Sequence, residues 1–110
     1  MADRHPTAPA APSYLDGQLR ERFDALAPVL VAMGTLTALD VDALARYVLS
    51  EHEYLRVSQL ALEAIKSGDP AEADKWTGVQ DKLLRQCMTA GAEFGLTPSA
   101  RRARGLIPPR

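Results

Sequence analysis

Apolar residues recur every three or four positions along most of the chain, the spacing that places side chains on one face of an α-helix. The first such run begins at Leu15 and stops at Gly34, a residue type that commonly ends helices in a left-handed conformation. Pro28 lies inside the run and predicts a kink or a break, because proline removes a backbone donor. The apolar positions of this predicted helix are Leu15, Leu19, Phe23, Leu26, Leu30 and Met33.

The next two runs predict a long helix and an antiparallel return, an αα-hairpin. Thr37 and Asp40 fit a capping box, in which the hydroxyl accepts from the third amide onward and the carboxylate reaches back. No glycine or proline follows before Gly68. The Gly-Asp-Pro sequence at 68–70 predicts a tight turn and a capped second helix, with Glu72 closing another capping box. The apolar stripes are Val41, Leu44, Val48, Leu55, Leu62 and Ile65 on the first arm, and Trp76, Val79, Leu83, Leu84, Cys87 and Phe94 on the second.

A short basic helix is predicted at the end of the chain. Gly95 followed by Leu96 fits a helix stop, and the Thr-Pro pair at 97–98 fits the start of a new helix that extends to about Arg104. Gly91 either weakens the second hairpin arm or lets another backbone approach closely. No alternation of apolar and polar residues indicates a strand. The predicted fold class is all-α, with a kinked N-terminal helix, a long antiparallel hairpin and a short basic C-terminal helix.

Composition limits the class of protein. A chain of 110 residues fits one domain, and its formal charge of −1 argues against coating nucleic acid by bulk charge, although a local basic patch remains compatible with it. The single cysteine permits no internal disulfide, and no apolar run suits a signal peptide or a membrane span. We expect a cytosolic protein with a disordered arm at 1–13, rich in Ala and Pro, one helical domain at 14–106 and a tail at 107–110.

Catalytic and metal-binding patterns are not found in the sequence. His52-Glu53 starts like the zinc-binding helix motif of metalloproteases, but position 56 is Arg instead of the second histidine. His52 is therefore interpreted as a solvated helix residue. Cys87 is interpreted as a small core residue, because the sequence suggests no base beside it. We predict a protein without catalytic residues, metal or cofactor.

Two segments carry a family resemblance. The first, Met33-Gly-Thr-Leu-Thr-Ala-Leu-Asp40, contains the pattern G-x-L-T-x-x-D at a helix start, and the second is the ending Phe94-Gly-Leu-Thr-Pro-Ser-Ala-Arg101. Together they resemble phage terminase small subunits of the cohesive-end packaging type, over roughly residues 15–106. The chain departs from that family in having Phe23 where Trp is frequent, and in the short linker at 68–70.

The resemblance implies a ring-forming homo-oligomer that recognises double-stranded viral DNA and presents it to the large terminase subunit. The large subunit of such motors holds the ATPase and the nuclease, so this chain need not be an enzyme and would act in the cytoplasm of the infected bacterial host. Two alternatives stay open. One is a helical adaptor that binds another protein without touching DNA. The other is a small helix-turn-helix transcription regulator, which would more often be a dimer.

The candidate DNA-contacting residues are arginines. The C-terminal cluster follows Glu93 with no acid in between and suits phosphate binding. Its alternatives are a solvated tail, arginines that complement a helix C-terminus, or docking on acidic surface of the large subunit. The arginines of the first helix lie beside Glu21 and Asp24, which favours a mosaic of surface charges. The predicted set is Arg101, Arg102, Arg104, Arg20, Arg22 and Arg46.

Self-association is predicted from the width of the apolar stripes. A hairpin and one short helix offer too few partners to cover both stripes, so the surplus surface is expected to pack against neighbouring subunits. The alternative is an ordinary intramolecular helical bundle. The predicted interface residues are Tyr47, Tyr54, Leu55, Leu62, Trp76 and Leu83.

Overall fold

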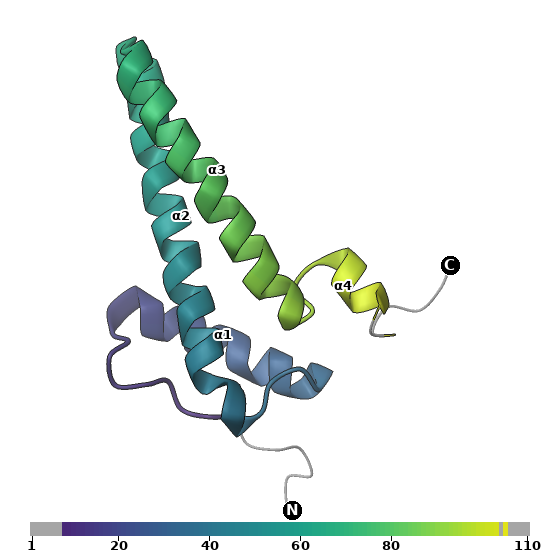
Figure 1. The fold of residues 1–110 in the computed structure, drawn as a ribbon. Coiled ribbons are helices and arrows are strands. Elements are labelled where there is room, and N and C mark those ends of the chain that lie inside the picture. The colour runs from purple at the N-terminus through teal and green to yellow at the C-terminus, as the bar shows by residue number, and fades with distance from the viewer. Residues whose placement is uncertain (1–7, 104, 106–110) are drawn as a thin grey trace, which may run out of the picture.

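The described chain is helical. The computed structural model describes residues 8–103 and 105, and these contain no strand. The elements are α1 (Gly17–Met33), the 3₁₀ helix η1 (Ala38–Asp40), α2 (Val41–Ser67), α3 (Pro70–Glu93) and α4 (Pro98–Ala103) (Figure 1). The predicted all-α class and the order of its helices are confirmed. Residues 1–7 of the predicted arm, the predicted tail at 107–110 and Arg104 lie outside the described residues.

α1 is a single helix that continues through Pro28 and begins at Gly17, two residues later than predicted. The break that was one of the two outcomes predicted for Pro28 does not occur, and the kink stays a prediction. Pro28 is exposed, so its ring does not disturb the core that α1 forms with the hairpin. Gly34 has a left-handed φ of 78° and its N–H donates to the Val31 carbonyl at 3.0 Å, which confirms the predicted stop.

The helix start at residues 37–40 forms as predicted. The Thr37 N–H donates to Asp40 Oδ2 at 3.0 Å, and the Thr37 hydroxyl accepts from the Leu39 N–H at 3.2 Å. Both halves of the capping box are present, and the first turn is the 3₁₀ helix η1 instead of a regular α-helical turn. The cap therefore fixes the point at which the chain turns from α1 into α2.

The hairpin turn is built on a left-handed glycine and an aspartate cap. Gly68 has a φ of 73°, and Asp69 Oδ1 accepts from the Glu72 N–H at 3.1 Å. The second capping box predicted for Glu72 is wrong. Its carboxylate accepts from the Trp76 indole N–H at 2.9 Å, while the Asp69 N–H donates to the Ala64 carbonyl at 3.3 Å. Each group thus has another partner, and Asp69 alone caps α3.

α3 ends and α4 begins where the glycine and threonine signals predicted. Gly95 has a φ of 75°, and the Leu96 N–H donates to the Gly91 carbonyl at 3.0 Å, which closes the last turn of α3. The Thr97 hydroxyl then accepts from the Ala100 N–H at 3.2 Å and caps α4. α4 lies beyond the C-terminal end of α3, to one side of the hairpin (Figure 1).

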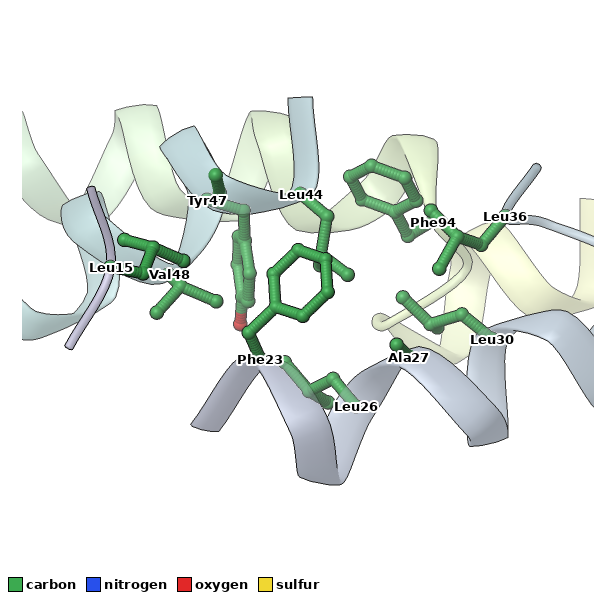
Figure 2. Packing of buried hydrophobic residues seen from close by; sticks show 11 residues of the cluster. Leu15, Phe23, Leu26, Ala27, Leu30, Leu36, Leu44, Tyr47, Val48 and Phe94 are labelled. Atoms are coloured by element: carbon green, nitrogen blue, oxygen red, sulfur yellow. The ribbon is translucent and has the colours of Figure 1, made fainter. Parts of the chain in front are cut away.

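The hydrophobic core lies at the base of the hairpin, where α1 crosses α2 (Figures 1 and 2). Phe23 of α1 points toward α2 and is completely buried, as is Leu44 on the facing helix. Phe94, just after α3, covers one side of the same cluster (Figure 2). Ala8 and Ala11 of the predicted arm also pack against it. The fully buried large side chains are Phe23, Leu15, Leu30, Leu44 and Val48.

The seam between the hairpin arms is made of smaller side chains. Toward the turn, α2 buries only Val57, Ala61 and Ala64 against α3, and α3 itself buries Gly91 alone. Small residues let the two helices approach closely but use little of the apolar surface on either arm. The stripe predicted along the first arm is therefore divided. Leu44 and Val48 are buried in the core, whereas Leu55, Leu62 and Ile65 are exposed.

Candidate nucleic-acid and assembly surfaces

Arg22 on α1 and Glu51 on α2 form the ion pair that links the first helix to the hairpin. Arg22 Nε donates to Glu51 Oε1 at 2.8 Å and Arg22 Nη2 donates to Oε2 at 3.1 Å, a two-pronged contact that matches the planar guanidinium to the carboxylate. The hydrogen bond to Glu51 raises the pKa of Arg22. Arg22, predicted as a DNA contact, is therefore paired within the chain, although its side chain is 46 % exposed.

Tyr47 and Cys87 extend this polar cluster across to α3. The Tyr47 hydroxyl donates to Glu51 Oε2 at 3.1 Å. Burial first, and then the negative charge of Glu51, raise the pKa of Tyr47 to about 12. Burial, followed by the charge of Glu51, also raises the pKa of the Cys87 thiol. Cys87 packs against the core with its thiol protonated, which agrees with the structural role predicted for it.

The other two predicted arginines of the N-terminal half lie in different surroundings. Arg20 Nε donates to the Leu15 carbonyl at 3.1 Å and its Nη2 donates to the Pro12 carbonyl at 3.4 Å, so this side chain holds the segment before α1. Arg46 is exposed on α2. The hydroxyl of the nearby Tyr14 donates to Asp42 at 3.0 Å. Burial, followed by this hydrogen bond, raises the pKa of Tyr14, and the positive charge of Arg46 opposes the rise. Both arginine side chains are exposed, and Arg20 differs from Arg46 in donating to these two backbone carbonyls.

The two described C-terminal arginines also differ in their hydrogen bonds and exposure. Arg101 Nη1 donates to the Gly95 carbonyl at 3.1 Å, so this side chain bridges the turn between α3 and α4. Arg102 is exposed at the outer side of α4. Arg104 lies outside the described residues. The structure therefore distinguishes Arg101, which bonds within the fold, from Arg102, which is exposed.

The predicted interface residues also divide. Tyr47 is only 8 % exposed and belongs to the intramolecular core, so it is corrected from an interface residue to a core residue. The physical reason is that α1 and the end of α3 close over this part of α2. Tyr54 and Leu83 are half-buried along the seam. Leu55 and Leu62 are 56 % and 50 % exposed, which is the surplus apolar surface that was expected.

Trp76 lies near the hairpin turn and is held by its own helix. Its indole N–H donates to Glu72 at 2.9 Å, and Lys75 Nζ lies 4.7 Å from the ring centroid, a cation–π contact. The half-buried ring lines a shallow groove of about 320 Å³ together with Leu60 and Glu63. These two contacts to residues of α3 fix the orientation of the ring.

Several exposed apolar residues were not predicted to be surface. Leu84 and Met88 on α3 are 37 % and 55 % exposed, and Leu39 in η1 is 95 % exposed. Leu84 was assigned with Leu83 to the stripe of the second arm, and helical spacing alone does not say which of two neighbours faces the partner helix. Leu84 and Met88 are four residues apart, a spacing that would have paired them on one face.

The remaining chemistry of the described residues is sparse. No three His, Cys, Asp or Glu side chains in them are grouped to hold a metal ion. None of the helices within the described ranges is long and apolar enough to cross a membrane. His52 is exposed on α2, as predicted.

Comparison with known proteins gives one match. A family model described as phage terminase, small subunit, matches residues 20–106. No curated protein matches the chain, and neither does any solved structure.

Proposed function

Because the chain belongs to the phage terminase small subunit family, we propose that it recognises double-stranded viral DNA and delivers it to the large terminase subunit. Membership of the family assigns the chain a role in phage DNA packaging. The observation that carries the proposal is the extent of the match, since residues 20–106 include most of α1 and all the later helices. In this proposal the chain catalyses nothing, needs no cofactor and acts in the cytoplasm of the infected bacterial host.

The proposed DNA contacts rest on the arginines that the fold leaves open. Arg46 and Arg102 are exposed, and Arg104 follows them in sequence on the basic C-terminal segment. Arg20, Arg22 and Arg101 each donate to a backbone carbonyl or to Glu51, so they are proposed to orient the DNA-contacting elements, although Arg20 and Arg22 are themselves exposed. Arginine suits DNA-backbone binding because its planar guanidinium donates two parallel hydrogen bonds to phosphate oxygens, independently of the base sequence.

In this proposal, assembly into a ring supplies the affinity for DNA that a single subunit lacks. With a formal charge of −1, one copy offers few phosphate contacts. Joining several copies in a ring makes later contacts intramolecular and multiplies the overall affinity. The exposed Leu55 and Leu62 support such self-association, because apolar surface of this kind is stabilised by burial. Since each phosphate contact releases counterions, DNA binding should weaken steeply as salt is raised.

A second candidate function is a protein-binding adaptor that does not touch DNA. It is favoured by one observation, namely that three of the six predicted arginines are used inside the fold. The large terminase subunit would then be the partner of the exposed hairpin surface.

The test is a pair of measurements on the full chain. Light scattering after size exclusion is expected to give a mass well above that of a tetramer of the 11.9 kDa chain. Gel retention of duplex DNA is expected at low salt and should fall as salt rises. A large assembly without DNA retention would favour the adaptor, whereas a monomer or dimer that binds one specific operator would favour a transcription regulator.

A further inference from the structure

A groove of about 170 Å³ lies where α1 crosses α2, and both helices line it. Its apolar lining consists of Leu19, Val48 and Leu55. A water molecule takes up about 30 Å³ in the liquid, so the groove has room for several waters or for one small polar group. The remaining lining residues are polar, namely Gln18, Arg22, Glu51 and His52.

The polar lining supplies hydrogen-bond donors from both helices. Gln18 and Arg22 are four residues apart, so they lie on one face of α1, and both are exposed. His52 is exposed on α2, and its imidazole carries at least one N–H donor in either protonation state. Glu51 is the only acid among the described residues that line the groove. An amide, a guanidinium and an imidazole around one opening suit an anion with several acceptor oxygens.

Glu51 provides acceptor oxygens to Arg22 in the way that such an anion would. Its two oxygens accept from Arg22 Nε at 2.8 Å and from Nη2 at 3.1 Å. A carboxylate and a phosphate offer the same pair of acceptor oxygens to the two parallel N–H groups of a guanidinium. A phosphate in the groove would therefore compete with Glu51 for Arg22.

The pair of Arg22 and Glu51 is placed so that its partners can exchange. The two side chains are 46 % and 20 % exposed, and an exposed ion pair adds little stability. Glu51 also accepts from the Tyr47 hydroxyl at 3.1 Å, a bond that does not depend on Arg22. When Arg22 turns to another anion, the carboxylate thus keeps a donor and contact with water, and no charge is left buried without a partner.

We propose that this groove binds one phosphate of the DNA backbone through Arg22, and that Glu51 pairs with Arg22 until the phosphate displaces it. The inference rests on the DNA recognition in the proposed function and adds a phosphate site to it. In the free chain the pair with Glu51 orients α1, and in the complex the same guanidinium contacts DNA.

The exchange explains what Glu51 contributes to recognition. One ion pair replaces another, so Arg22 adds little net affinity for DNA while Glu51 is present. Phosphate contacts carry no sequence information, and an acid that competes with them disfavours duplexes that are held by backbone charge alone. Removing the acid should therefore strengthen binding to every duplex, whatever its sequence.

Three variants of the full chain test the site. E51Q removes the competing charge and keeps an acceptor oxygen for the Tyr47 hydroxyl. E53Q is the matched control, because Glu53 lies on the same helix, pairs with the exposed Arg56 and loses the same charge. R22A/E51Q removes both the competitor and the proposed phosphate ligand. Urea unfolding verifies that each variant is folded under the conditions of gel retention with duplex DNA.

The expected result is that E51Q binds DNA about two- to fivefold more tightly for each groove in contact, the gain from no longer displacing an exposed ion pair. Its plot of log affinity against log salt should steepen by about 0.9 for each added phosphate. R22A/E51Q should lose both gains, and E53Q should keep the salt dependence of the unmodified chain.

Three outcomes overturn the phosphate site and leave the proposed function intact. Equal gains in E51Q and E53Q would come from net charge alone. Unchanged binding in E51Q would mean that Glu51 competes with no phosphate. A gain that persists in R22A/E51Q would belong to another side chain. If neither the unmodified chain nor E51Q retains DNA at low salt, both the phosphate site and the proposed DNA recognition are wrong.

Discussion

The aromatic ring of Tyr47 on α2 packs against Gly91 on α3, where a Cβ atom would lie 3.2 Å from Tyr47 Cε1. The same ring carries the hydroxyl that donates to Glu51, which in turn pairs with Arg22 of α1. One side chain therefore meets all three long helices at the base of the hairpin. A side chain at position 91 would crowd this ring, which is held at its opposite end by the hydrogen bond to Glu51.

Substituting Gly91 tests this close approach. Gly91→Ala is expected to lower the free energy of unfolding by about 1 kcal/mol, because crowding against Tyr47 and Leu96 outweighs the better helix propensity of alanine. Gly78→Ala, on the same helix with nothing within 4 Å, should raise it by about 0.5–1 kcal/mol. Urea unfolding followed by circular dichroism measures both. Equal gains in the two variants would contradict the tight contact at Gly91.

The raised pKa of Tyr47 predicts a loss of stability in alkali. In the unfolded chain the phenol ionises near 10.0, and in the fold near 12, so the folded state holds this proton longer. The stability that this pKa difference contributes is fully present below pH 10 and is lost as the pH rises from about 10 to about 12. Tyr47→Phe should remove this part of the pH dependence, and Tyr54→Phe is the matched control. A pH profile that is identical in Tyr47→Phe and the unmodified chain would refute the assignment.

The arginines are predicted to separate into two classes. Arg102→Ala should weaken DNA retention and reduce the slope of its salt dependence, with little change in stability, because the side chain is exposed. Arg22→Ala should lower the free energy of unfolding by roughly 0.5–1 kcal/mol through loss of the Glu51 pair, with a smaller effect on DNA. Gel retention at several salt concentrations and urea unfolding are measured on both. The reverse assignment of effects would place the DNA site on α1.

Asp69 is expected to fix the start of α3 through its side chain. Asp69→Ala removes the acceptor for the Glu72 N–H and should cost about 1 kcal/mol of stability. Asp69→Asn keeps an acceptor oxygen and should cost much less. Thermal unfolding of the two variants gives the comparison. Similar losses in both would mean that the charge of Asp69, and not its hydrogen bond, stabilises the turn.

Local sequence signals predict most of the helix boundaries. Gly34, Gly68 and Gly95 adopt the left-handed conformations expected at helix ends, and Thr37 and Asp69 cap as predicted. These features depend on a few neighbouring residues, because a left-handed turn or a cap is decided within one helical turn. Glu72 is the exception, since its carboxylate had two possible partners in the same stretch and bonds to Trp76.

The sequence by itself determined the all-α class, the hairpin and the basic ending, because periodicity, caps and glycine stops are properties of short segments. The tertiary structure decided which apolar and charged residues are used inside the fold. α1 crosses only the base of α2, so Tyr47 is buried while Leu55 and Leu62, on the same helix, are exposed. The same crossing brings Glu51 to Arg22 and leaves Arg46 in solvent. Which face of a helix is covered depends on where another helix packs, and helical spacing alone does not contain that information.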